Sequence, residues 1–236
     1  MLDGLSIQGL HSYYGEAHVL NGVSLEVGRR HVVALLGRNG MGKSTLIRSI
    51  IGLRPPAVHE GEIFYRGERL RGLSPHQIAQ KRIALVPQGR RLFASLTVIE
   101  HLTMVGQRPG AAWNLQRVLD LFPRLGDRRK HRGNQLSGGE RQMLAIARAL
   151  MLDPELILMD EPSEGLAPVL VQQLEGILQH LKQTGLAILL VEQNLYSALA
   201  VSDEVYVLET GSIVYRGSAA DLLDDPTTMQ RFLGVK

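Results

Sequence analysis

The sequence of 236 residues contains no cysteine, and this absence excludes disulfide bonds and thiolate metal sites. Its formal net charge of +3 is too small to indicate nucleic-acid binding by itself. The sequence also lacks an apolar run long enough to cross a bilayer. Residues 1–10 carry Asp3 and no long apolar stretch, so they do not resemble a signal peptide. We therefore expect a cytoplasmic protein that reaches a membrane only through a partner.

A glycine-rich stretch lies between a predicted buried strand, Val32–Leu36, and a predicted helix that starts near Lys43. Residues 37–44 have the spacing G-x-x-x-x-G-K-[ST] of a phosphate-binding loop. Glycines let backbone amides face a polyphosphate, and the helix start adds its positive dipole end. We expect Lys43 to reach the β- and γ-phosphates and the Ser44 hydroxyl to ligate Mg²⁺. The alternative is a glycine-rich turn with an ordinary surface lysine. The predicted nucleotide-binding residues of this loop are Gly37, Arg38, Asn39, Gly40, Met41, Gly42, Lys43, Ser44 and Thr45.

Two acidic residues follow a second buried strand, which we predict over residues 156–159. Ligands of α/β sheets bind at the carboxyl ends of the strands. Asp160 is therefore suited to a Mg²⁺ shell, and Glu161 is suited to act as a base that activates water. The alternative is an acidic pair that faces solvent at the strand end.

A glycine pair opens a later helix, whose apolar face starts at Met143. Ser137 can cap this helix, and Gly138 and Gly139 leave its first amides uncovered. The chain thus contains a second helix end that can bind an anion, distant in sequence from the first. By itself the segment also fits a capped helix after a glycine turn.

The rest of the sequence predicts an α/β protein. Alternating apolar residues at 5–7 and 23–27 are typical of antiparallel strands. Residues 95–150 predict a mainly helical region that opens with the capping box Thr97-Val-Ile-Glu100.

We expect one domain over residues 1–236, because the length suits a large domain with a subdomain. Residues 1–94 and 151–236 would form the nucleotide-binding core. Residues 95–150 would form the helical subdomain.

The order of these motifs, over nearly the full length, resembles the nucleotide-binding domain of ABC transporters. The resemblance implies a P-loop NTPase fold of ABC type, with a mixed sheet, an antiparallel N-terminal β part and a helical subdomain. It also implies ATP and Mg²⁺ as cofactors. The residues similar to the family signature, which would contact ATP held by a second subunit, are Leu136, Ser137, Gly138, Gly139 and Glu140.

The resemblance adds further site residues to those inferred above. It implies that Tyr14 stacks on adenine, although Tyr13 competes for this role. It implies that Gln88 lies near Mg²⁺ and the γ-phosphate. The implied metal ligands are Ser44, Gln88 and Asp160, and the implied catalytic residues are Lys43, Glu161 and Gln193.

The chain departs from most ABC family members at two positions. Ala167 stands where most members carry aspartate, and Gln193 stands where most carry a switch histidine. Gln193 can donate a hydrogen bond to the γ-phosphate, but it cannot hold a positive charge or shuttle a proton. A nucleotide-binding scaffold that switches without turnover is therefore an alternative to an ATPase.

The same departures resemble one subfamily, the branched-chain amino acid importer ATPases of the smaller of their two types. The segments that fit this subfamily are Val86–Phe93, Leu121–Leu125 and Glu161–Pro168. Importer ATPases for urea are similar, so a urea or amide importer stays an alternative. The solute would touch other subunits, and the sequence therefore does not identify it.

We expect a head-to-tail dimer, because the chain has two anion-binding helix ends but one set of magnesium and base residues. The second subunit would be a copy of this chain or a related ATPase. The resemblance implies membrane permease subunits as partners, a solute-binding protein as an indirect partner, and a peripheral location at the cytoplasmic face of the membrane. A soluble ABC-type ATPase that acts on nucleic acid or ribosomes is the rival hypothesis. The basic run at residues 128–132 is short and lacks interleaved aromatics, so we expect no nucleic-acid partner.

Overall fold

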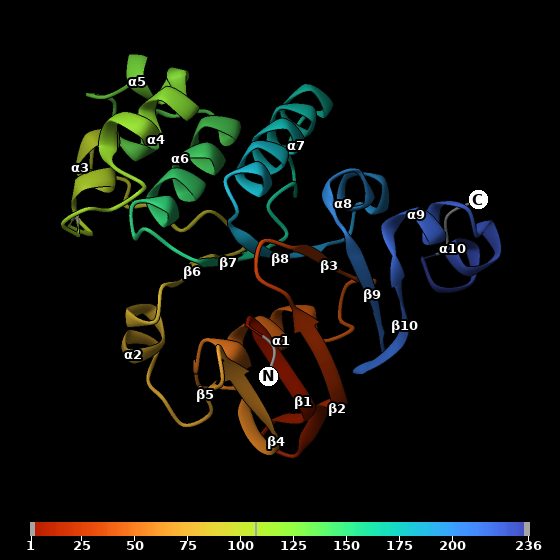
Figure 1. Cartoon of the computed structure of the whole chain (residues 1–236). Helices are drawn as coiled ribbons and strands as arrows, with labels where there is room; N and C mark the ends of the chain where they lie inside the picture. Colours follow the sequence, from red (N-terminus) through yellow and green to blue (C-terminus); the bar gives the residue numbers. More distant parts are fainter. Residues whose placement is uncertain (1–2, 107, 234–236) are drawn as a thin grey trace.

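The computed structural model describes residues 3–106 and 108–233, which form two sheets flanked by helices (Figure 1). The first sheet is antiparallel, with the strand order β2-β1-β4-β5. Leu5 pairs with Val27 and Ile7 pairs with Leu25, so the antiparallel strands predicted at residues 5–7 and 23–27 are confirmed. The strands of this sheet are β1 (Leu5–Tyr14), β2 (Ala17–Val27), β4 (Ala57–Tyr65) and β5 (Glu68–Arg69).

The second sheet is mixed and has the strand order β10-β9-β3-β8-β7-β6. Its strands are β3 (Val32–Leu36), β6 (Ile83–Val86), β7 (Leu156–Asp160), β8 (Ala187–Glu192), β9 (Glu204–Glu209) and β10 (Ser212–Ser218). All neighbours pair in parallel except β10, which is antiparallel to β9. Every residue of β3, β7 and β8 is buried, which explains why these segments are nearly continuous apolar runs in the sequence.

Parallel pairing places the carboxyl ends of β3, β6, β7 and β8 at the same edge of the mixed sheet. The glycine-rich loop follows β3, Gln88 follows β6, Glu161 follows β7 and Gln193 follows β8. The fold therefore gathers at one edge four segments that are far apart in the sequence, as ligand sites of α/β sheets require.

The helices lie on both sides of the mixed sheet. Figure 1 shows α1 between the two sheets and α6, α7 and α8 on the opposite side of the mixed sheet. The helices are α1 (Lys43–Ile50), α2 (Pro75–Gln80), α3 (Val98–Thr103), α4 (Leu115–Leu121), α5 (Pro123–Asp127), α6 (Gly138–Leu150), α7 (Pro168–Gln183), α8 (Leu195–Val201), α9 (Ala219–Leu223) and α10 (Pro226–Leu233), with a 3₁₀ turn, η1, at Gly133–Gln135.

Strand β3 separates two hydrophobic clusters. Val33 and Leu35 pack with α1 and the antiparallel sheet, whereas Val32, Ala34 and Leu36 pack with α6, α7 and α8. This alternation follows from the opposite directions of successive side chains in a strand. Because both faces of β3 are buried, the loop that follows it is held from two sides.

Residues 95–106 and 108–150 contain α3 to α6 and η1. Thr97 and Glu100 form the capping box that the sequence predicts at the start of α3. Buried residues of α3, α4 and α6 join the same hydrophobic cluster as Val32 and Ala34 of the sheet. The division into a core and a helical subdomain therefore stays a prediction. Among the described residues, no helix combines the length and the apolar character that a membrane span requires.

Candidate active site

The glycine-rich loop runs from β3 to the first turn of α1, and its shape depends on two glycines. A Cβ atom on Gly37 would lie 2.5 Å from the Leu208 carbonyl oxygen. Gly42 has φ +104°, and a Cβ there would lie 2.9 Å from Leu20 Cδ2. Gly42 is also the N-cap of α1 and makes no side-chain capping bond. The first amides of α1 are thus left for an external anion, as a phosphate-binding loop requires.

Lys43 lies at the centre of the loop and is almost completely buried. Its Nζ donates to the Gly37 carbonyl at 2.8 Å and to the Arg38 carbonyl at 3.2 Å. The same Nζ lies 2.9 Å from Glu161 Oε1, and the exposed fractions of the two side chains are 3% and 6%. The lysine therefore joins the phosphate-binding loop to the predicted catalytic carboxylate.

Ser44 and Asp160 meet beside this pair, because Ser44 Oγ donates to Asp160 Oδ1 at 3.1 Å. Burial, as the largest cause, raises the pKa of Asp160, while the hydrogen bond from Ser44 opposes this effect. Hydroxyl and carboxylate oxygens are ligands that Mg²⁺ prefers. A divalent cation between them would favour the ionised carboxylate. The residues present therefore fit the predicted magnesium site.

Glu161 adopts a backbone conformation that is rare for a non-glycine residue, with φ +49°. Its amide donates to the Val191 carbonyl at 2.9 Å, and its Oε2 accepts a hydrogen bond of 3.1 Å from Gln88 Nε2. Such strained residues cluster at functional sites and cost on the order of 1–3 kcal/mol. The tight turn after β7 aims the carboxylate at Lys43 and Gln88.

A cavity of about 300 Å³ lies over these groups. Gly37, Arg38 and Asp160 contact its residues through the bonds given above, although they are not part of its lining. The lining residues are Val19, Asn39, Gly40, Gly42, Lys43, Ser44, Thr45, Gln88 and Glu161. The tertiary structure thus brings most of the predicted nucleotide and metal residues to one cavity.

Comparison with known proteins now decides the family, because residues 20–164 match the family described as ABC transporter. The chain belongs to the ABC transporter family. The predictions of an ABC-type fold and of an ATPase are confirmed.

Several curated ABC proteins are similar to this chain over almost its whole length. The high-affinity branched-chain amino acid transport ATP-binding protein BraG of Pseudomonas aeruginosa is 46% identical, covering 98% of this chain and 99% of BraG. A probable branched-chain amino acid transport ATP-binding protein, LivF of Archaeoglobus fulgidus, is 36% identical, with coverages of 96% and 97%. The lipopolysaccharide export system ATP-binding protein LptB of Escherichia coli K12 is 32% identical, with coverages of 98% and 97%.

Solved ATP-binding cassettes of ABC transporters share the fold. A nucleotide-free cassette matches with a TM-score of 0.85 and 27% identity, covering 100% of both chains. A cassette in its ADP conformation matches with a TM-score of 0.84 and 26% identity, again covering 100% of both chains. The cassette fold is therefore shown for this chain.

The residues predicted as the ABC signature lie at the start of α6 and not in the cavity of Lys43. Ser137 Oγ accepts from the Glu140 amide at 3.2 Å, and Glu140 Oε2 accepts from the Ser137 amide at 2.8 Å. Ser137, Gly139 and Glu140 line a different, smaller pocket beside α7. Within one ABC chain, the two predicted anion-binding helix ends therefore stay apart.

The two candidate tyrosines differ in their surroundings. The Tyr13 ring stacks between His18 and His59, with centroid distances of 4.2 Å and 4.5 Å. The preceding residue, Ser12, is buried and contacts Ser49 of α1. Because successive side chains of a strand point to opposite faces, Tyr13 lies on the face away from α1. This arrangement favours Tyr14 for the adenine-stacking role, which stays a prediction.

Three charged residues at the site have no role in the sequence-based predictions. Glu192 at the end of β8 is buried and accepts from the Ser163 amide at 2.9 Å and from the Gln193 amide at 3.1 Å. Burial is the largest cause that raises the pKa of Glu192. A glutamate directly after the apolar run 186–191 is the signal that could have identified it. The other two are Arg90 and Glu164. Arg90 donates to the Glu164 carbonyl oxygen, and the Glu164 carboxylate accepts from Gln88.

Proposed function

We propose that this chain is the ATPase subunit of an importer for branched-chain amino acids. The observation that carries the reaction is the buried contact between Lys43 and Glu161, which joins a phosphate-binding loop to a base. The solute class rests on the 46% identity with BraG, a protein named for branched-chain amino acid transport, and on the subfamily segments in the sequence. The identity with LptB, a protein named for lipopolysaccharide export, is lower, at 32%, and therefore supports an exporter less than an amino acid importer.

The chemistry would proceed in the cavity over Lys43. The loop amides and Lys43 would hold the β- and γ-phosphates of ATP, and Ser44, Asp160 and Gln88 would hold Mg²⁺. The metal ion supplies charge neutralisation on the phosphate oxygens when it is bound. Glu161 would orient or deprotonate the water that attacks the γ-phosphate in line, while Lys43 stabilises the developing charge. Lys43 must therefore turn from Glu161 toward the phosphates when ATP enters.

A second ATPase subunit would complete the site. The separation of the signature from the cavity in one chain supports a head-to-tail dimer, in which Ser137 to Glu140 of one subunit cover the ATP of the other. The partner would be a copy of this chain or a related ATPase. The γ-phosphate would bridge the two halves, which would separate after its hydrolysis.

The permease would bind beside the Gln88 loop. Phe93 and Met104 are large apolar side chains with exposed fractions of 53% and 50%, and they support a protein contact near this loop and α3. A solute-binding protein would act through the permease. The subunit would then be peripheral, at the cytoplasmic face of the membrane.

The Glu161→Gln variant tests this proposal. Removal of a general base typically lowers a rate by about 10²- to 10⁴-fold. We expect steady-state phosphate release to fall in that range, ATP binding to persist, and a closed dimer to accumulate in light-scattering measurements with Mg·ATP. Glu175→Gln on α7, outside the cavity, is the matched control and should hydrolyse ATP at the parent rate. A parent rate for Glu161→Gln would reject Glu161 as the base.

A further inference from the structure

Arg90 lies where three loops of the site meet. Its Nη2 donates to the Glu164 carbonyl oxygen at 3.2 Å. Its Nη1 lies 3.1 Å from the position that a Cβ on Gly138 would take, so the guanidinium packs against the signature backbone. A Cβ on Gly165 would lie 3.7 Å from Nη2. One side chain therefore contacts the acidic segment after β7 and the first turn of α6.

Gln88, two residues before Arg90, binds the side chain of the same Glu164. Gln88 Nε2 donates to Glu164 Oε2 at 3.0 Å and to Glu161 Oε2 at 3.1 Å. Glu164 is thus bound through its carboxylate by Gln88 and through its carbonyl by Arg90. The Gln88 loop is thus in contact with both Glu164 and the first turn of α6.

Helix stability does not explain the position of Arg90. The amino end of a helix carries partial positive charge, so a cation there is unfavourable by a few tenths to about 1 kcal/mol. Arginine offers several donors in a rigid planar fork, which lets one guanidinium contact two loops at once. Gly138, which has no side chain, leaves room for this fork. The contacts therefore describe a link between two loops and not a stabilising cap of α6.

We propose that Arg90 is a positioning residue that couples Gln88, which reads the γ-phosphate of its own subunit, to the signature turn offered to the ATP of the partner. This inference rests on the proposed head-to-tail ATPase. Through Arg90, binding of ATP in one site orients Ser137 and Gly138 toward the other site. The two sites of a dimer then hydrolyse ATP cooperatively.

The test compares Arg90→Ala with Arg91→Ala, which removes the same charge from the adjacent, exposed arginine. Three quantities are measured: fluorescent-nucleotide affinity of the single subunit, the ATP dependence of hydrolysis, and ATP-driven dimerisation in the Glu161→Gln background. Coupling energies between sites typically correspond to about 5- to 150-fold. We expect Arg90→Ala to keep the nucleotide affinity, to need at least about fivefold more ATP for dimerisation, and to lose the sigmoidal dependence of the rate. Arg91→Ala should match the parent.

Arg90→Lys provides a second variant that keeps the charge and most of the packing. Lysine lacks the planar fork and cannot hold Glu164 and the signature turn together, so we expect a loss in the same direction. Parent-like cooperativity and dimerisation in both variants would overturn the role of Arg90. Equal losses of single-subunit affinity and of rate would also overturn it, because they would indicate damage to the cavity. If the parent chain neither hydrolyses ATP nor dimerises, alone or mixed with a related ATPase subunit, the proposed function fails instead.

Discussion

At the scale of single residues, the contact between Lys43 and Glu161 dominates the site. Both groups are buried, and each offsets part of the desolvation cost of the other's charge. Breaking such a pair by removing one partner leaves a buried charge, which is more costly than removing both. The pair therefore links the stability of the chain to the same residues that we assign to catalysis.

The variants Lys43→Met, Glu161→Gln and their combination measure this link. Lys43→Met should lower the free energy of unfolding by about 3 kcal/mol, because Glu161 keeps its charge without a cation. The double variant should recover part of that loss. Denaturant titrations give these values, and ATP titrations should show weak binding whenever Lys43 is absent. Additive losses in the double variant would contradict a direct pair.

At the scale of elements, α3 and α6 start with the same hydrogen-bonded motif, a capping box, which α2 also has. Thr97 and Glu100 cap α3, and Ser137 and Glu140 cap α6, with reciprocal side-chain and backbone bonds in both. The two caps differ in position, since only the second lies in the segment that we predict as the ABC signature. A comparison of the two caps therefore distinguishes an effect on stability from an effect on ATPase activity.

Thr97→Ala and Ser137→Ala should therefore cost similar stability but differ in activity. Each removes an N-cap hydroxyl, which typically lowers the free energy of unfolding by about 1 kcal/mol. Only Ser137→Ala should also lower the rate of phosphate release by the isolated ATPase, because its hydroxyl would face the γ-phosphate of the partner. Thermal unfolding and a steady-state assay compare the two. Equal rates for the two variants would count against the signature contact.

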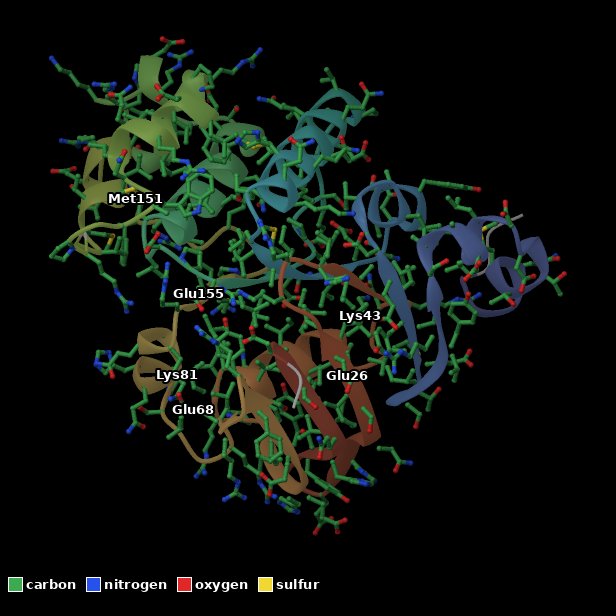
Figure 2. All side chains as sticks on the ribbon, viewed as in Figure 1. Glu26, Lys43, Glu68, Lys81, Met151 and Glu155 are labelled. Carbon is green, nitrogen blue, oxygen red and sulfur yellow. The ribbon has the colours of Figure 1, made fainter. Side chains whose placement is uncertain are left out.

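At the scale of the whole molecule, the mixed sheet separates two hydrophobic clusters and collects the reactive residues at one edge. Figure 2 labels Lys43 at the start of α1 and Met151 directly after the carboxyl end of α6. The predicted signature residues lie at the opposite end of α6, and three of them line a pocket that does not include Lys43. The proposed composite site would therefore need two molecules in opposite orientation. Such an arrangement has two equivalent sites related by a twofold axis.

Mixing two inactive variants tests this symmetry. In a dimer of one Glu161→Gln chain, which keeps ATP binding, and one Ser137→Ala chain, one site carries both defects and the other carries none. An equimolar mixture should therefore regain about a quarter of the parent's intact sites, measured as phosphate release above the sum of the separate variants. The head-to-tail arrangement predicts this gain, whereas a site built from one chain predicts none.

The sequence by itself determined the local elements and the family. The capping box of α3, the Ser137 cap of α6, the glycine-rich loop and the buried strands depend on neighbours within a few residues, so the sequence predicts them without knowledge of the fold. The ABC motifs follow in order along the chain for the same reason. Local patterns do not decide between Tyr13 and Tyr14 for the adenine-stacking role, because the two have identical side chains in adjacent positions.

Only the tertiary structure decided which distant residues touch. It brought Lys43 to Glu161, Gln88 to Glu164 and Arg90 to Gly138, and it placed Tyr13 between two histidines on the outer face of its sheet. Gln88 and Glu164 are 76 residues apart in the chain. Such contacts depend on the order and register of parallel strands, which the pairing of all the strands fixes together. No short segment carries that information.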